Sequence, residues 1–307
     1  MKYANLLESC NLCKRECGVN RLNGEMGVCA ANDNLKIARA ELHLWEEPSI
    51  SMGKGSGTVF FSHCNLKCVF CQNHEISQEY NGAYITIERL SEIFLELQYK
   101  GANNINLVTP THYVPQIIEA LEISKSQGLN IPILYNTNGY DTLETIKLLD
   151  GYIDVYLPDF KYFNNKYAIK YSKANNYLDN IIPILEEMVK QTGEPSFDDE
   201  GKIKKGVIIR HLMLPGLLFD SKKVIDIIYN HFGDKVYISI MNQYTPMNKS
   251  YQYPEINKHL NPKHYDSLIS YASDIGITNG YIQDEGANTE EFVPSFRLEG
   301  VFKKDKG

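Results

Sequence analysis

The feature that most constrains the fold of this 307-residue chain is an alternation of short apolar runs with helical segments. Six runs rich in β-branched and aromatic residues have the length of buried strands, and a weaker seventh follows: 58–62, 105–109, 131–135, 153–157, 207–212, 236–241 and 280–283. Between these runs, apolar residues recur at intervals of three and four, which is typical of one helix face. Strands that alternate with helices predict βαβ units and a parallel sheet, either open and doubly wound or closed into a full or partial barrel.

Helix start signals support the expected helices. Pro115 suits a first helical turn, Asp141 with Glu144 matches a capping box, and Asn261 before Pro262 can cap another helix. Two stretches lie outside the pattern. Residues 191–206 are polar and predict a loop or hairpin before the fifth strand, and residues 284–307 predict a polar tail that carries three phenylalanines, Phe292, Phe296 and Phe302.

Composition narrows the class of protein. With 31 Lys and Arg against 38 Asp and Glu, the net charge is −7, which argues against a nucleic-acid binder that needs a basic face. No apolar run approaches the roughly 18 residues of a membrane helix, and the first residues lack the apolar core of a secretory signal. We therefore expect a cytoplasmic protein without a membrane segment, in which thiols stay reduced.

All seven cysteines fall within the first 71 positions, and in a reduced compartment such a group predicts metal ligands. Cys64, Cys68 and Cys71 follow the first strand of the pattern, at the carboxyl end where parallel sheets bind ligands. Three thiolates this close can hold three corners of one iron–sulfur cube. Zinc requires a fourth ligand, which His63 or His74 could supply.

The spacing Cys-x3-Cys-x2-Cys, with Phe70 before the third cysteine, resembles the signature of radical S-adenosylmethionine (radical SAM) enzymes. The wider segment 55–75 resembles the pyruvate formate-lyase activating enzymes. The resemblance implies a partial (β/α)6-type barrel and a [4Fe–4S] cluster held by Cys64, Cys68 and Cys71. It also implies reductive cleavage of S-adenosylmethionine to a 5′-deoxyadenosyl radical that abstracts hydrogen. An external one-electron donor such as flavodoxin or ferredoxin would supply the electron.

Three further strand ends match the activating enzymes. The run Asn136-Thr-Asn138-Gly resembles their Asp-Thr-Asn-Gly, Asp159-Phe-Lys161 resembles their Asp-x-Lys, and Arg210 opens a run that resembles their Arg-x4-Pro-Gly. By this resemblance these residues and Phe70 contact the cosubstrate. Asp159 and Lys161 are the expected catalytic pair, in which the lysine meets a carboxylate and the aspartate an ammonium or hydroxyl group.

The chain departs from that family at two places. Where the family carries Gly-Gly-Glu for the methionine amino group, this chain has residues 108–112, and Thr109, Thr111 and His112 are the candidate replacements. Asn136 stands where the activating enzymes have an acid. The resemblance therefore supports the cofactor chemistry more strongly than it supports the substrate.

The first 50 residues predict a small metal-binding module. Its cysteines follow the spacing Cys-x2-Cys-x3-Cys-x11-Cys, and four thiolates complete either a structural zinc site or a second [4Fe–4S] cluster, with Cys10, Cys13, Cys17 and Cys29 as ligands. Such a module would relay electrons or brace the fold. The barrel is expected over residues 51–283.

The leading function by resemblance is that of an activase for a backbone glycine in a partner enzyme. Two alternatives share the cofactor and act on a ribosomally made peptide or a small metabolite. A third, from another class, is a zinc or iron–sulfur binding module without turnover.

Overall fold

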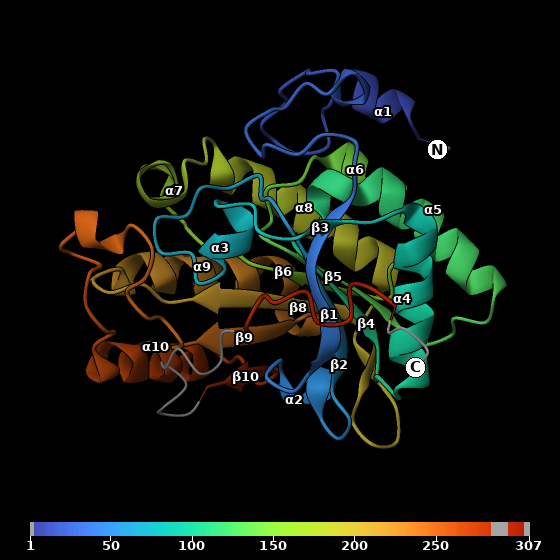
Figure 1. The fold of residues 1–307 in the computed structure, drawn as a ribbon. Coiled ribbons are helices and arrows are strands. Elements are labelled where there is room, and N and C mark those ends of the chain that lie inside the picture. The colour runs from blue at the N-terminus through green and yellow to red at the C-terminus, as the bar shows by residue number, and fades with distance from the viewer. Residues whose placement is uncertain (1–2, 284–293, 304–307) are drawn as a thin grey trace.

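The structure, a computed structural model, describes residues 3–283 and 294–303 and is built on one large sheet (Figure 1). Seven of its described strands run parallel: β2 (Ser56–Phe61), β4 (Ile105–Val108), β5 (Ile133–Thr137), β6 (Val155–Pro158), β8 (Ile203–Leu212), β9 (Tyr237–Met241) and β10 (Gly280–Ile282). They coincide with the seven apolar runs. The parallel α/β fold expected from the sequence is confirmed.

The strand order is β10-β9-β8-β6-β5-β4-β2-β1-β3. The end strands β10 and β3 (Ala83–Tyr84) do not pair with each other among the described residues, so the sheet stays open along one side. Strand β7 (Ser196–Phe197) pairs antiparallel with the start of β8. The polar stretch at 191–206 therefore contains the expected hairpin.

Amphipathic helices cover the outside of the sheet (Figure 1). In α4 the expected apolar face is buried, as the exposures of Leu90, Ile93 and Phe94 show. The longer helices are α4 (Ile87–Tyr99), α5 (Val114–Ser126), α6 (Leu143–Leu148), α7 (Asn165–Ser172), α8 (Tyr177–Thr192), α9 (Leu218–Phe232) and α10 (Pro262–Asp274). Short turns of helix are α1 (Asn5–Glu8), α2 (Pro48–Ser51), α3 (His74–Ser77), η1 (Arg21–Asn23), η2 (Thr111–Tyr113), η3 (Gly233–Lys235) and η4 (Ser250–Gln252).

The sheet begins earlier in the chain than the sequence predicts. Strand β1 (Lys36–His43) pairs antiparallel with β2 over most of its length, so these residues belong to the sheet and not to a separate module ending at residue 50. Its buried residues Ile37, Ala38 and Ala40 lie among charged residues. Because two of the three are small alanines, the strand shows little apolar periodicity in the sequence.

Two helix predictions need correction. The cap of α6 is Thr142, whose hydroxyl accepts a hydrogen bond from the Thr145 N–H, while Asp141 is fully buried and accepts from Tyr135 and Thr137. Helices α7 and α8 were not expected. Pro183 lies inside α8, and a proline at an interior position is a signal against a helix.

The described part of the tail packs on β1. The backbone N–H of Leu298 donates to the carbonyl of Ala38, and the carbonyl of Glu299 accepts from the Ala40 N–H. Phe296 stacks edge-on against Phe60, with ring centroids 5.4 Å apart. Phe302 is exposed, and Phe292 lies outside the described residues.

The N-terminal segment lies at the top of the molecule in Figure 1, next to α6. The N–H of Lys14 donates to the Tyr140 carbonyl, and the N–H of Thr142 donates to the Leu12 carbonyl. The segment is therefore bonded to the loop that follows β5. Because β2 and β5 are parallel, this is also the edge of the sheet where the three-cysteine loop emerges.

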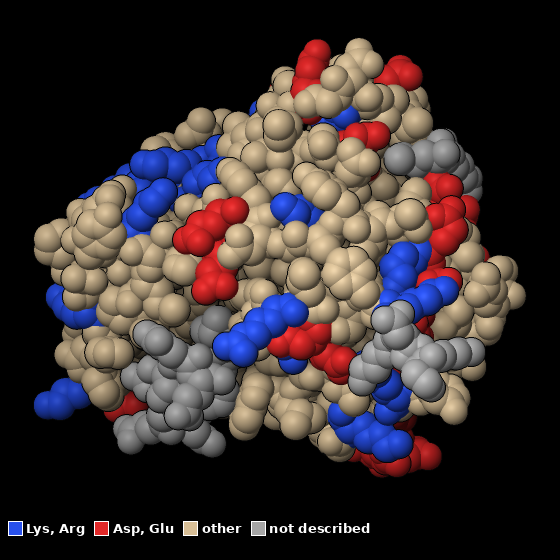
Figure 2. All heavy atoms as spheres, viewed as in Figure 1, with Lys and Arg blue, Asp and Glu red and all other residues tan. Residues whose placement is uncertain are grey.

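The surface and the helices agree with the composition. On the face drawn in Figure 2, Lys and Arg form several separate groups, and only some of these groups have acidic side chains beside them. In the described part of the chain, no helix is both long and apolar enough to cross a bilayer.

Candidate active site

The loop after β2 carries Cys64, Cys68 and Cys71, and all three line one cavity of about 240 Å³. His63 has a left-handed backbone (φ 74°) that turns the chain from the strand into this loop. Phe70 also lines the cavity and packs against Tyr244, with ring centroids 5.8 Å apart. The structure therefore brings the three thiols and the aromatic residue of the motif to the same side of the loop.

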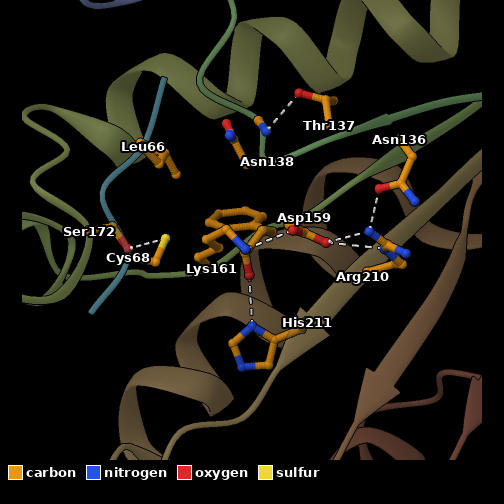
Figure 3. Close-up of polar contacts among 12 residues, drawn as sticks. Leu66, Cys68, Asn136, Thr137, Asn138, Asp159, Lys161, Ser172, Arg210 and His211 are labelled. Carbon is orange, nitrogen blue, oxygen red and sulfur yellow. Dashed lines mark hydrogen bonds and ion pairs between the residues drawn. The ribbon is translucent and has the colours of Figure 1, made fainter. Parts of the chain in front are cut away.

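A compact ion cluster faces the same cavity from the ends of β6 and β8 (Figure 3). One carboxylate oxygen of Asp159 lies 2.7 Å from Lys161 Nζ, and the other lies 3.0 Å from Arg210 Nη2. Burial alone would raise the pKa of Asp159, but the two cations outweigh it and lower this pKa. Burial would likewise lower the pKa of Lys161, and the carboxylate of Asp159 reverses that effect. All three side chains are therefore charged at neutral pH.

The run at the end of β5 closes around the ion cluster and the cysteine loop. Asn136 accepts a hydrogen bond from Arg210 Nη2 at 2.5 Å. Asn138 donates to Asn65 Oδ1 at 2.7 Å and approaches Cys64 Sγ at 3.5 Å. Gly139 has φ 74°, and a Cβ there would lie 2.8 Å from the Asp159 carbonyl, so the close approach of these two loops requires glycine.

The three candidates for the methionine amino-group site separate in space. Thr109 lines the cavity and has a left-handed backbone (φ 57°), a strained conformation for a β-branched residue. Thr111 and His112 are buried in η2 and do not line this cavity, so their assignment to it is wrong. They follow Pro110, which continues into a helical turn and carries both side chains into the interior. His112 instead lies against the four N-terminal cysteines.

Sequence reasoning missed Glu46, which reaches the cavity from the connection between β1 and α2. Its carboxylate accepts a hydrogen bond from Asn106 Nδ2 at 2.9 Å and lies 3.5 Å from Arg210 Nη1. Its side chain is only 10% exposed. Burial raises the pKa of Glu46 to about 7 even though Arg210 opposes the shift. The one sequence signal was a pair of acidic residues beside the single tryptophan.

Glu46 should make stability depend on pH. Its pKa is about 7 in the folded chain and near 4.5 when unfolded, so its contribution falls as pH rises from 4.5 through 7. Replacing Glu46 by glutamine removes this loss. We expect Glu46→Gln to gain about 3 kcal/mol of unfolding free energy relative to the parent between about pH 5 and pH 8.

The measurement is urea denaturation of both chains across that pH range. Glu200→Gln removes a carboxylate that is 72% exposed and provides the control, which should change the free energy of unfolding by less than about 1 kcal/mol. A parallel profile for Glu46→Gln and the parent would contradict the assigned pKa.

Cys64 and Cys71 carry thiols rather than thiolates when no metal is bound. Burial raises the pKa of Cys64 to about 12 and that of Cys71 to about 11. Without a metal, both are protonated at neutral pH. A bound cation must therefore displace these protons, which metal ligation by thiolate does.

Trp45 is 61% exposed and lines the mouth of the cavity. The same cavity is also lined by His43, Phe60 and Met241. The mouth thus presents apolar and aromatic surface beside a charged interior.

The four N-terminal cysteines surround a second, much smaller hollow. Cys10, Cys13 and Cys29 are buried and Cys17 is partly exposed. Gly27 is needed here, because a Cβ on it would lie 2.7 Å from Cys17 Sγ. In the described residues, no three His, Cys, Asp or Glu side chains are gathered to hold a single metal ion, and this holds for both cysteine sets.

Known proteins resemble the chain in sequence and in fold. A protein of Methanocaldococcus jannaschii, the uncharacterized protein MJ0674, is 34% identical over 277 residues, which span 87% of this chain and 75% of that protein. Among solved structures, Streptococcus suis SuiB bound to S-adenosylmethionine matches with a TM-score of 0.53 at 15% identity, over 73% of this chain and 49% of SuiB.

The hydrogenase maturase HydG matches with a TM-score of 0.50 at 14% identity, over 75% of this chain and 52% of HydG. At these identities SuiB and HydG show the fold alone, and the chain spans about half the length of each. The model of the Radical SAM superfamily matches residues 58–238, which contain the three-cysteine loop and the ion cluster. The chain belongs to the Radical SAM superfamily, whose members use a [4Fe–4S] cluster and S-adenosylmethionine.

Proposed function

We propose that this protein cleaves S-adenosylmethionine reductively and uses the 5′-deoxyadenosyl radical to abstract hydrogen from a polypeptide segment. The observation that carries the proposal is the meeting of three thiols, the ion cluster of Asp159, Lys161 and Arg210, and Glu46 in one cavity. This combination offers metal ligands and groups for a zwitterion side by side.

The side chains fit the family's cofactors. Cys64, Cys68 and Cys71 would hold a [4Fe–4S] cluster, since three thiolates leave one iron open to the methionine moiety. When bound, the cluster supplies the electron that breaks the S–C5′ bond. Lys161 would hold a carboxylate of the cosubstrate and Asp159 an ammonium or hydroxyl group, which suits the charges that the two side chains carry. Phe70, buried beside the third cysteine in the chain, would limit the access of water to it.

The ion cluster positions Lys161 for this task. The carboxylate of Asp159 pairs with Lys161 through one oxygen and with Arg210 through the other. Rotation of this carboxylate would break one of the two ion pairs. Asn136 accepts a hydrogen bond from Arg210, and Asn138 approaches Cys64 Sγ, so the loop after β5 contacts both the ion cluster and the cysteine loop. Such prior ordering lowers the entropic cost of aligning the reacting groups.

A polypeptide substrate is supported by the mouth of the cavity. Trp45 exposes a large aromatic side chain there, the kind of surface that contacts macromolecules. SuiB, which is similar in fold, has been solved bound to its precursor peptide SuiA. An activase acting on a partner's backbone glycine is our first choice, because segment 55–75 resembles the activating enzymes. Modification of a short peptide is the second.

The test uses anaerobically reconstituted protein with dithionite and S-adenosylmethionine. We expect release of 5′-deoxyadenosine. With a polypeptide encoded beside the gene and made with deuterated glycine, deuterium should appear in the 5′-deoxyadenosine, and an activase should leave a glycyl radical detectable by electron paramagnetic resonance. Colourless, zinc-loaded protein without cleavage would identify a non-catalytic module. If deuterium enters 5′-deoxyadenosine only from a labelled small metabolite, the substrate is a small metabolite and not a polypeptide.

A further inference from the structure

Two side-chain amides on the wall of the cavity are held by contacts that leave each of them one unused polar group. Gln72 directly follows Cys71, and Gln243 follows β9. Both line the cavity and both are partly exposed. We propose that the side-chain NH2 group of Gln243 and the side-chain oxygen of Gln72 bind one peptide group of the substrate backbone. This inference rests on the function proposed above and specifies how its polypeptide substrate is held.

The orientation of the Gln243 amide follows from its partners. The side-chain oxygen of Gln283 accepts from the backbone N–H groups of Asn242 and Gln243, at 2.9 and 3.2 Å. A backbone N–H can only donate, so the atom of Gln283 that it meets is the oxygen and not the nitrogen. The Gln283 nitrogen then donates to Gln243 Oε1 at 3.0 Å. The side-chain oxygen of Gln243 is thereby used, and its NH2 group remains.

This NH2 group has a poor partner. Among the described residues it meets only Met241 Sδ, at a distance of 3.6 Å. A thioether sulfur is a weak acceptor of hydrogen bonds, whereas an amide NH2 group can donate two of them. Gln243 and Met241 both line the cavity. A carbonyl oxygen that enters the cavity would therefore be a better acceptor for Gln243 than the one it has.

Gln72 offers the complementary group. Its Nε2 donates to the backbone carbonyl of Gln243 at 2.9 Å. A carbonyl can only accept, so the other end of the Gln72 amide is an oxygen. Within the described part of the chain, no donor is hydrogen-bonded to this oxygen. Because Gln72 is bonded to the backbone of Gln243, the unused acceptor and the unused donor belong to one connected unit.

A donor beside an acceptor matches the chemistry of a peptide group. Its carbonyl accepts one hydrogen bond, here from Gln243, and its N–H donates one, here to Gln72. Neither glutamine carries a charge, so the pair suits a neutral group and gives no preference for an ionised side chain. A site that binds the backbone accepts glycine as readily as any other residue.

The place of the two amides in the sheet separates them from the ion cluster. Asp159 and Arg210 lie at the ends of β6 and β8, whereas Gln243 follows β9, which pairs with the end strand β10. The pair therefore lies toward the open side of the sheet, while Gln72 adjoins a proposed cluster ligand in the chain. The adenine ring of the cosubstrate also carries a donor beside an acceptor, and measurement of both ligands distinguishes it from a peptide group.

The first experiment uses the anaerobically reconstituted full chain and the polypeptide encoded beside the gene, made with deuterated glycine. Gln243→Glu keeps the size of the side chain and an acceptor for Gln283, but it replaces the NH2 group by a carboxylate oxygen. We expect KM for the polypeptide to rise about tenfold or more, because one hydrogen bond is lost and the peptide carbonyl meets a negative charge. Gln252→Glu, on the exposed turn η4, is the control and should leave this KM unchanged.

The dissociation constant of S-adenosylmethionine, measured by calorimetry, decides between the two ligands. In Gln243→Glu it should change much less than KM for the polypeptide. A weaker affinity for S-adenosylmethionine with an unchanged KM for the polypeptide would assign the amides to adenine and overturn the proposal.

The second experiment tests the acceptor on Gln72. In synthetic segments of the same polypeptide, an ester replaces the peptide group on one side of the glycine or the other, which removes one N–H at a time. In the parent chain we expect one of the two esters to raise KM about tenfold, and in Gln72→Leu this penalty should largely disappear. The iron content of Gln72→Leu shows whether the neighbouring cysteine loop is intact. Equal penalties for the esters in the parent and in Gln72→Leu would overturn the proposal.

The outcomes separate this inference from the proposed function. If no deuterium passes from the polypeptide to 5′-deoxyadenosine in the parent chain, the proposed function fails, and the inference fails with it. If deuterium passes while KM is unchanged in Gln243→Glu and the ester penalty is unchanged in Gln72→Leu, only the inference fails.

Discussion

Replacing Cys68 by alanine should abolish 5′-deoxyadenosine formation. Two thiolates cannot hold three corners of a cube, and the iron that would take up S-adenosylmethionine is lost with the cluster. Changes beside a metal ligand already cost 10–100-fold, so removal of a ligand should lower the rate by more than about 100-fold. The readouts are iron content, the brown absorbance of the cluster, and product release in the presence of dithionite.

Ser172→Ala is the matched control. The Ser172 hydroxyl lies 3.1 Å from Cys68 Sγ and contacts Tyr162, so its loss disturbs the surroundings of the thiol but leaves the ligand in place. We expect this variant to keep its iron and to lose at most about tenfold in rate. Unchanged product release by Cys68→Ala would remove Cys68 from the cluster and reject the proposed function.

The second large effect should follow from Asp159→Asn. This substitution preserves the shape of the side chain and removes the charge that separates Lys161 from Arg210. Breaking a buried ion pair by removing one partner typically costs 3–5 kcal/mol, and we expect a loss of about that size in the free energy of unfolding. Urea denaturation measures it.

The same variant should shift the titration of Glu46. The negative charge of Asp159 is one of the causes that raise the pKa of Glu46, so its removal should move this pKa downward from about 7. Lys204→Gln, which removes an exposed partner of Asp198 at 3.3 Å, provides the comparison and should cost less than about 1 kcal/mol. A similar small loss in Asp159→Asn would show that the ion cluster contributes little to stability.

The barrel strands could be predicted because both faces of a parallel sheet are covered. Every residue of β6 is buried, and this strand appears in the sequence as an uninterrupted apolar run. Strand β1 lies at the border of the sheet and exposes part of its length, so charged residues interrupt it. Helix α8 was missed for a different reason. Its interior proline argues against a helix in the sequence, and it is accommodated by packing that only the folded chain provides.

The residues of the site also fall into those that the sequence predicts and those that it does not. The cysteines, Asp159, Lys161 and Arg210 lie in short motifs at strand ends, and parallel strands bring such ends together. Glu46 belongs to no motif and reaches the cavity only because β1 returns the chain to the opposite end of β2. Thr111 and His112 were placed in the cavity because they follow β4, yet a short helical turn directs them inward.

Strand β1 also leads to a part of the cavity wall that lies outside the stretch matched by the family model. The stretch matched by the family model, 58–238, keeps three thiols and three of the four charges that face the cavity. It leaves out Glu46, the strand that borders β2, and the surface on which Leu298 and Glu299 bind. The cavity is therefore lined partly by residues that precede the stretch matched by the family model.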